Sequence, residues 1–202
     1  SLQSSLLAGL LAAAVGIILG LLAGYYGGVL STLILRLSDA QLSIPGHIFT
    51  LTVAAIMGGG LYSIVVAIGI GMVPTYIRMM NGLVLSNKEN DYITASILTG
   101  ESNMKVLFKH LLPNCIPSLI VLFTMNLGNG IMMEATLSYL GVGVTPPTAT
   151  WGGMVYDGYK YLTINPWNSI IPGIAIILVI ISFNVIGDGL RDVLDPRLKG
   201  RL

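Results

Sequence analysis

The sequence predicts an all-α protein, a polytopic membrane helical bundle with five transmembrane helices, from its composition and from the spacing of its charges. Hydrophobic residues make up 54% of the 202 residues and charged residues only 9%, and the mean hydropathy is +0.83. Such values are typical of integral membrane proteins. Residues 1–35, 40–77, 111–133 and 161–187 carry no Asp, Glu, Lys or Arg. Because a helix needs about 20 apolar residues to cross a bilayer, the second run holds two spans and each of the others holds one.

The first span has small residues at every fourth position, which predicts a face for packing against another helix. Lipid offers no hydrophobic drive between helices, so close backbone contact must supply the attraction. The glycines of this stripe are Gly16, Gly20, Gly24 and Gly28. A glycine-lined conduit is the alternative interpretation. We expect the five spans over residues 5–26, 41–57, 61–85, 116–139 and 169–186.

The distribution of basic residues predicts the orientation. With five spans, nine of the ten Lys and Arg residues fall on one side of the membrane and Lys160 alone on the other. The positive-inside rule therefore places the start of the chain outside and the C-terminus in the cytoplasm. The nine are Arg36, Arg78, Lys88, Lys105, Lys109, Arg191, Arg197, Lys199 and Arg201.

The chain is interpreted as one transmembrane domain, residues 1–202, with three segments outside the membrane. These are a cytoplasmic loop over residues 88–114, an external loop over residues 141–168 and a cytoplasmic tail over residues 188–202. The external loop combines Pro and Gly with Trp and Tyr, which collect at membrane interfaces. The first apolar run lacks a basic leading segment and a cleavage site, so we read it as a mature span that lacks an upstream helix. The net charge of +1 argues against a nucleic-acid partner.

The cytoplasmic loop is the one polar island of the chain. Gly100 predicts a break between two short helices, the second of which ends before Pro113. The candidate caps are Asn90 or Asp91 for the first helix and Glu101 or Ser102 for the second. An i, i+3, i+4, i+7 pattern predicts one apolar face on the second helix, made of Met104, Leu107, Phe108 and Leu111.

The fourth span carries the candidate pathway residues. Asn126, Asn129 and Met133 share one helix face, and Glu134 follows at its outer end. An ionisable residue near the membrane is a functional candidate because burying its charge is costly. The alternatives are a packing face for the first three and contact with the outer interface for Glu134. His47 lies in an apolar setting without metal-ligand spacing, and we expect a packed, neutral histidine and no metal site.

The cytoplasmic loop resembles the signature loop of ABC importer permeases, whose pattern is Glu-Ala-Ala, three residues, Gly, and a second short helix that closes on Leu-Pro. Thr94 and Ser96 depart from the Glu-Ala-Ala part. The stretches SYLGVGVTPPTATWGGM from Ser138 and FNVIGDGLRDVLDPRL from Phe183 are similar to the dipeptide, oligopeptide and nickel branch of these permeases. Members of that branch have one more helix and an external segment before the first span. The matching loop residues are Thr94, Ala95, Ser96, Gly100, Leu112 and Pro113.

The resemblance implies a type I permease fold and a membrane subunit of an ATP-driven importer in a prokaryotic plasma (inner) membrane, forming half of the pathway for a short peptide. Implied partners are a second homologous permease, two cytoplasmic ABC ATPases and an extracytoplasmic substrate-binding protein. The sequence has no Gly-Lys pair and hence no P-loop, so we expect no enzyme activity and no cofactor in this chain, with ATP and Mg²⁺ on the ATPases. The implied ATPase-coupling residues are Asp91, Thr94, Ala95, Ser96, Gly100, Lys105, His110 and Pro113.

Two alternatives remain open. The same role in a nickel or metal-chelate importer shares the quoted motifs. An intramembrane aspartyl protease has superficial support from Tyr156-Asp157 and Gly187-Asp188, because such enzymes use two carboxylates that share a proton. Against it, Asp157 lies in a Pro/Gly-rich interfacial loop and not inside a span, and the pattern around Asp188 does not match.

Overall fold

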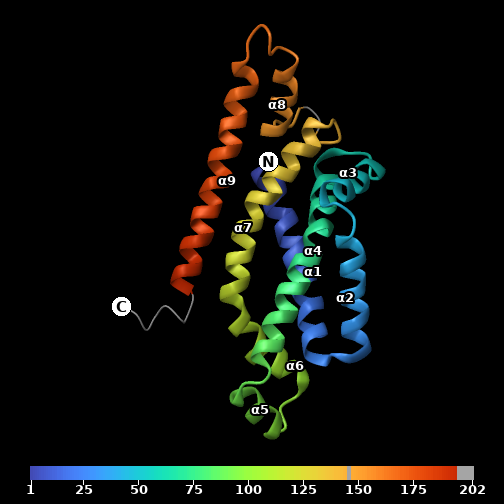
Figure 1. The fold of residues 1–202 in the computed structure, drawn as a ribbon, viewed down its shortest axis with the longest axis vertical. Helices are drawn as coiled ribbons and strands as arrows, with labels where there is room; N and C mark the ends of the chain where they lie inside the picture. The colour runs from blue at the N-terminus through green and yellow to red at the C-terminus, as the bar shows by residue number, and fades with distance from the viewer. Residues whose placement is uncertain (145–146, 195–202) are drawn as a thin grey trace.

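The computed structural model describes residues 1–144 and 147–194, and all regular structure in these residues is helical. Figure 1 shows an elongated bundle with a small helical projection at each end. We call these the α5 end and the α8 end. The elements are α1 (Leu2–Tyr26), α2 (Gly28–Leu42), α3 (Gly46–Ile56), α4 (Gly60–Asn87), α5 (Asp91–Leu98), α6 (Asn103–Lys105), a π-helical turn η1 (Val106–Leu111), α7 (Leu112–Tyr139), α8 (Trp151–Tyr159) and α9 (Trp167–Leu194).

The chain passes along the bundle five times (Figure 1). It runs along α1 to the α5 end, back through α2 and α3, down α4, up α7 and down α9. Among the described residues, four helices are long and apolar enough to cross a membrane: Leu2–Tyr26, Gly60–Asn87, Asn103–Tyr139 and Trp167–Leu194. The predicted all-α membrane bundle is confirmed, but only four of its five passes are single spanning helices.

The second pass corrects the prediction of one helix over residues 41–57. It consists of α2 and α3, which are separated at Ser43–Pro45. Residues 28–42, expected as a connection, are helical and follow α1 directly because Gly27 and Gly28 both adopt positive φ, at 66° and 57°, and reverse the chain. The break comes at Pro45, which has no N–H to continue the α2 ladder.

The packing of α1 on α4 depends on three of the four glycines in the predicted stripe. A Cβ atom at Gly16 would lie 2.4 Å from the Tyr76 Cβ, one at Gly20 would lie 2.6 Å from the Ile77 carbonyl oxygen, and one at Gly24 would lie 2.7 Å from the Val84 Cβ. Gly28 departs from the stripe because α1 ends at Tyr26, and a Cβ added at Gly28 would meet nothing within 4 Å in the described residues.

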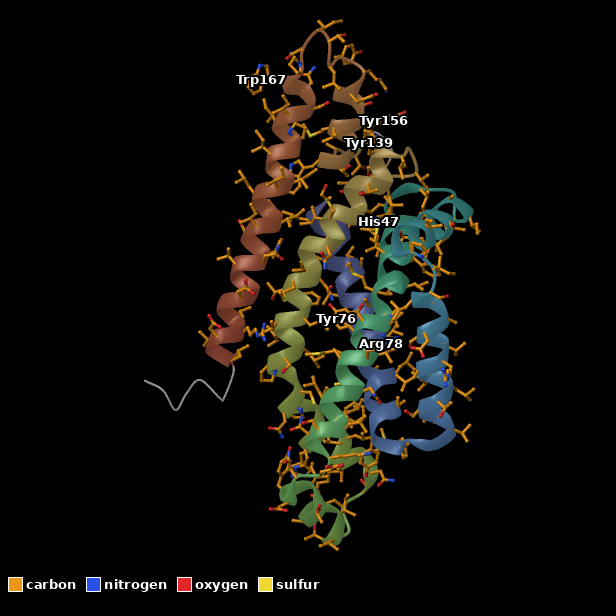
Figure 2. The ribbon with its side chains drawn as sticks, viewed as in Figure 1. His47, Tyr76, Arg78, Tyr139, Tyr156 and Trp167 are labelled. Atoms are coloured by element: carbon orange, nitrogen blue, oxygen red, sulfur yellow. The ribbon has the colours of Figure 1, made fainter. Side chains whose placement is uncertain are left out.

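The α2 helix covers the proline in α4. Pro74 lies inside α4 and cannot donate to the Ile70 carbonyl, which would be left without its helical partner. The Gln41 amide of α2 donates to this carbonyl at 2.8 Å. Asp39 of α2 also forms an ion pair with Arg78 at 2.6 Å, between the two helices (Figure 2). These contacts explain why the polar α2 lies along α4.

The α8 end is closed by aromatic and backbone contacts. Tyr139, at the end of α7, makes edge-to-face contacts with Tyr156 and Tyr159 of α8, with ring centroids 6.4 and 6.0 Å apart. Gly158 packs so closely on the start of α9 that a Cβ there would lie 2.6 Å from the Asn168 carbonyl carbon. The external loop predicted over residues 141–168 therefore contains a helix, with residues 145–146 outside the described part.

The last helix is longer than predicted. We expected a span over residues 169–186 and a tail over residues 188–202, whereas α9 continues to Leu194. The remainder of the tail, residues 195–202, lies outside the described residues. The charged positions Asp188, Arg191 and Asp192 thus belong to the last turns of α9, because nothing from Gly187 to Leu194 breaks the helix.

Candidate functional site

The α5 helix is anchored to the bundle by one buried side chain. Ile93 is 1% exposed and belongs to an apolar cluster with residues of α1, α4, η1 and α7. Polar contacts add to this anchor: Asn114 of α7 donates to the Tyr92 hydroxyl at 3.3 Å, and the Tyr25 hydroxyl of α1 donates to Asn103 at 2.9 Å. The residues expected to form a cytoplasmic loop are therefore attached to three of the long helices.

Gly100 ends α5 in the manner predicted. Its φ is 80°, a left-handed value that other residues adopt only with strain. The Gly100 N–H donates to the Ile97 carbonyl at 3.0 Å, and the Glu101 N–H donates to the Ser96 carbonyl at 3.2 Å. This pair of bonds is a Schellman motif, which satisfies carbonyls that the end of the helix would leave unpaired.

Glu101 ties the two halves of the segment together. Its carboxylate accepts a hydrogen bond from the Ser96 hydroxyl of α5, forms an ion pair with Lys105 at 2.5 Å, and lies within hydrogen-bond distance of the His110 Nε2 atom of η1, at 2.7 Å. The contacts with Lys105, Ser96 and His110, in that order, lower the pKa of Glu101 from 4.5 to about 2. The carboxylate therefore stays charged throughout the neutral range and holds α5 against η1.

The second short helix does not end before Pro113, which corrects the prediction. It begins at Asn103 and continues through η1 into α7, so that Pro113 lies at the start of a long helix. In an α-helix the Pro113 ring would meet the carbonyl four residues back. The wider π turn, with the Leu112 N–H donating to the Leu107 carbonyl, lies immediately before it.

The π turn also changes which apolar residues are buried. Leu107 and Leu111 are fully buried, as is Val106, whereas Met104 and Phe108 are 58% and 45% exposed. The predicted four-residue apolar face is thus wrong for Met104 and Phe108, because the segment does not keep an α-helical period.

The remaining predicted coupling residues divide between two surfaces of α5. Ser96 points inward to Glu101, while Asp91, Thr94 and Ala95 are exposed. Next to them at the tip, Ile97 and Leu98 are also exposed, Leu98 to 81%. Large apolar side chains on a short polar projection are typical of a protein-binding surface.

The four candidate pathway residues of α7 do not face one cavity. Asn126 is buried and Asn129 is exposed, and the Asn129 amide reaches the Asn126 side-chain oxygen at 3.4 Å. Met133 is half-buried, and its sulfur lies 3.3 Å from the Thr50 hydroxyl of α3. Glu134 is fully buried and accepts a hydrogen bond from Ser138 at 2.8 Å, so it does not reach the outer interface.

The geometry bears on the metal and protease alternatives as well. Within residues 1–144 and 147–194, no group of three or more His, Cys, Asp or Glu side chains could hold a metal ion, and His47 is exposed on α3 and not packed. Asp157 lies beside the start of α9, where Gly158 meets Asn168, and Asp188 lies at the opposite end. Residues 168 and 188 are separated along α9 by about 30 Å, at a rise of about 1.5 Å per residue. Two carboxylates so far apart cannot share a proton.

Glu101 is the residue of this segment that sequence reasoning treated only as a helix cap. Its i, i+4 spacing to Lys105 was a usable signal, because such pairs face each other on a helix. The contacts with Ser96 and His110 depend on the reversal of the chain at Gly100 and on the π turn. Neither contact could be deduced from spacing.

Comparison with known proteins gives a family match and two kinds of relative. Residues 16–200 match the family described as binding-protein-dependent transport system inner membrane component. The glutathione transport system permease protein GsiD of Escherichia coli is 39% identical over 200 residues, which are 99% of this chain and 66% of that protein. The dipeptide transport system permease protein DppC of Haemophilus influenzae is 40% identical over 190 residues, which are 94% of this chain and 64% of that protein. The chain thus spans 64–66% of the length of these relatives.

The fold also has solved counterparts. A chain of the MetNI methionine ABC transporter, solved in an inward-facing conformation, superposes with a TM-score of 0.76 at 21% identity, covering 96% of this chain and 92% of that chain. A second crystal form of the same transporter gives a TM-score of 0.75. At this identity the likeness concerns the fold.

Proposed function

This chain belongs to the family of binding-protein-dependent transport system inner membrane components, and from this premise we propose that it is the membrane-spanning subunit of an ATP-driven importer of short peptides. Peptides are the substrate class that the names of GsiD and DppC give for those two relatives. The chain forms half of the translocation pathway and pairs with a second permease. Energy comes from two cytoplasmic ATPases that hold the ATP and Mg²⁺, and substrate arrives on an extracytoplasmic binding protein.

The observation that carries this proposal is the construction of the segment from α5 to η1. Its outer surface offers Ile97 and Leu98 to a partner, while its inner surface is fixed to the bundle by Ile93 and by the Glu101 contacts. A partner that pulls on α5 would therefore move α1, α4 and α7 with it. Alternating access by rocking of helices needs such a rigid connection between the nucleotide site and the pathway.

The proposed orientation places the α5 end in the cytoplasm. Lys88, Lys105 and Lys109 lie near the α5 end and Lys160 near the α8 end. Arg36 and Arg78 lie inside α2 and α4, in the half of each pass nearer the α5 end. The bias in basic residues supports a cytoplasmic α5 end and an external α8 end.

The test is uptake by the complete transporter in proteoliposomes with its second permease, ATPases and binding protein. We expect ATP-dependent uptake of a dipeptide or of glutathione, and we expect no uptake when the chain is omitted. ATP-dependent uptake of Ni²⁺ in the same vesicles, without uptake of either peptide, would assign the chain to the metal-importing alternative. Failure of the chain to associate with any ATPase would contradict the coupling role.

A further inference from the structure

A cavity between α4, α7 and the last turns of α9 has the composition of a ligand site. It has a volume of about 560 Å³, within the range of about 300–1,000 Å³ typical of small-molecule pockets. Its walls are mainly apolar, with Met79 and Leu83 from α4 and Val121, Leu122 and Met125 from α7. Unbranched Met side chains adapt to ligands of different shape.

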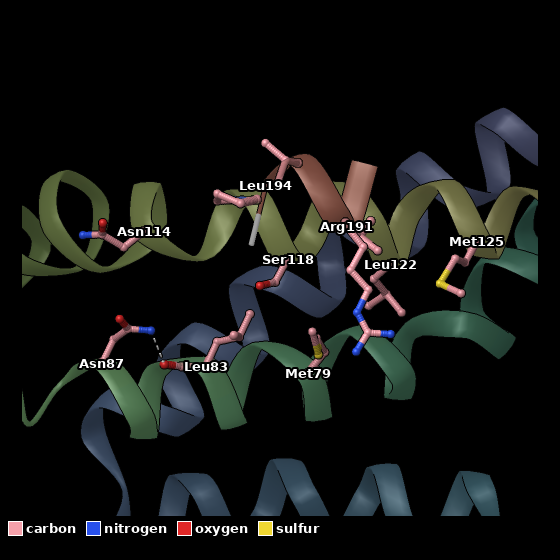
Figure 3. Close-up of a pocket in the computed structure, with 11 residues that line it drawn as sticks. Met79, Leu83, Asn87, Asn114, Ser118, Leu122, Met125, Arg191 and Leu194 are labelled. Atoms are coloured by element: carbon pink, nitrogen blue, oxygen red, sulfur yellow. Dashed lines mark hydrogen bonds between the residues drawn. The ribbon is translucent and has the colours of Figure 1, made fainter. Parts of the chain in front are cut away.

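Among the described residues, Arg191 supplies the one cationic group in the wall of this cavity. Figure 3 shows its side chain reaching from α9 past Leu122 toward α4, with the guanidinium beside Met79. Asp188 and Asp192 are its acidic neighbours on α9, and neither forms an ion pair with it in the part of the chain that the structure describes. A guanidinium presents five donors in a planar fork that matches a carboxylate or a phosphate.

Neutral polar groups from the other two helices lie in the same wall. Asn87 closes the cavity on α4, and Asn114 and Ser118 line it on α7. The Asn87 and Asn114 amides donate to the carbonyls of Leu83 and His110, both at 2.8 Å or less, and the Asn87 side-chain oxygen accepts from the Asn90 amide at 3.5 Å. This leaves the Asn114 side-chain oxygen and the Ser118 hydroxyl toward other partners. Few polar groups in a largely apolar wall are the usual composition of a specific small-molecule site.

The depth of the cavity limits which ligands can reach it. Arg191 lies about 16 Å beyond the midpoint of α9, by the helical rise of about 1.5 Å per residue. The hydrocarbon core extends about 15 Å from its centre, so an α9 centred in the bilayer would place the backbone at Arg191 where the core meets the headgroups. On α7 the lining of the cavity ends at Met125, one residue before Asn126.

We propose that this cavity is an oxyanion site in which Arg191 binds the charged head of a ligand while the apolar wall covers its body. Two sources carry this chemistry at this depth: the C-terminal carboxylate of a short peptide that leaves the pathway, and the phosphate of a lipid in the adjoining leaflet. The peptide source rests on the proposed function, whereas the lipid source does not.

The test uses the purified complete transporter without its binding protein, in wild-type form and as Arg191→Gln and Arg191→Lys. The first arm measures binding of dialanine and of dialanine amide, which lacks the carboxylate. For a peptide site, wild type binds dialanine at least about tenfold more tightly than the amide, Arg191→Gln removes this preference, and Arg191→Lys keeps part of it. The second arm measures retained phosphatidylglycerol by native mass spectrometry. For a lipid site, wild type and Arg191→Lys retain it and Arg191→Gln does not.

Two matched variants separate a ligand site from other effects of charge. Arg36→Gln removes an exposed arginine of α2 outside the cavity and should leave both arms unchanged. Asp195→Asn removes a carboxylate from the segment outside the described residues. If Asp195→Asn reproduces the Arg191→Gln result, the Arg191 guanidinium acts by pairing with the chain's own tail, and the proposal is wrong. The proposal would also be overturned if wild type and Arg191→Gln bound dialanine equally and retained phosphatidylglycerol equally. In that case, peptide uptake by both proteins would show that the proposed function still stands.

Discussion

Substitution of Gly100 tests whether the glycine turn at the end of α5 is needed to couple ATP hydrolysis to uptake. A Cβ added at Gly100 meets nothing within 4 Å in the described part of the chain, so the position has room for the first atom of a side chain. The cost is the backbone alone: the φ of 80° lies in the left-handed region, where an L-residue loses about 1–2 kcal/mol. A β-branched residue is at the upper end of that range. One or two kcal/mol shifts the balance between the ordered and frayed segment by a factor of about 5–30.

We therefore expect Gly100→Val to insert and pair with its sister permease but to lose ATP-driven uptake and substrate-stimulated ATPase activity together. Gly100→Asn should keep most of both activities, because Asn tolerates the left-handed region better than other non-glycine residues. Gly82→Ala is the control, since Gly82 also has open space around it but lies within α4, where alanine is favoured. The measurement is uptake and ATP hydrolysis in proteoliposomes. Normal values of both for Gly100→Val would refute the reasoning.

Three further predictions address packing, pH and topology. Gly20→Leu should lower the free energy of unfolding by about 1–3 kcal/mol in a thermal or denaturant assay, because its side chain would be forced into α4. The control Gly173→Leu, which has open space on α9, should not lower it. Equal effects of the two variants would mean that α1 and α4 do not pack as described. Because the pKa of Glu101 is lowered from 4.5 to about 2, its contribution to the order of the α5 segment is present above about pH 4.5 and is lost as the pH falls toward 2. Hydrogen exchange of the α5 amides should therefore become less protected over this pH range. Glu101→Gln should remove this pH dependence. Single cysteines at Ser102 and Thr148, both exposed, should react with impermeant reagents from opposite sides of the membrane in an otherwise cysteine-free protein, and labelling of both from one side would contradict the proposed orientation.

The sequence was sufficient to predict features that depend on composition and on single residues with special backbone freedom. Charge-free runs identified the membrane bundle, and a glycine at position 100 identified the end of α5. The small-residue stripe of α1 was informative for the same reason, since only glycine allows the approach seen at Gly16 and Gly20. Such features are local, and so they can be read without knowing what lies across the fold.

The second pass was mispredicted because its stability depends on tertiary contacts. A segment with Arg36 and Asp39 reads as a connection when it is considered alone. In the fold, Arg78 pairs with Asp39, and Gln41 satisfies the carbonyl that Pro74 leaves free. Partners some 30 to 40 residues away thus turn a polar segment into a helix along α4, and no periodicity in the segment itself reports them.

Glu101 explains the two departures of this chain from the Glu-Ala-Ala pattern, at Thr94 and Ser96. The carboxylate that the pattern has at the position of Thr94 is absent, but Glu101 supplies one on the other side of the Gly100 turn. In a Schellman motif, the residue that follows the glycine often packs against the residue three positions before the helix cap through an apolar contact. Those two positions are Glu101 and Ser96 here, and the apolar contact is replaced by a hydrogen bond.

This replacement links the end of α5 to more than the turn itself. An apolar contact would hold only the turn, whereas the Glu101 carboxylate also binds His110 in η1, which continues into α7. A force on the exposed tip of α5 is therefore carried to α7 by way of Glu101, and to α4 and α1 by way of Ile93. The serine that departs from the Glu-Ala-Ala pattern is, in this chain, part of the connection between the exposed tip of α5 and the long helices.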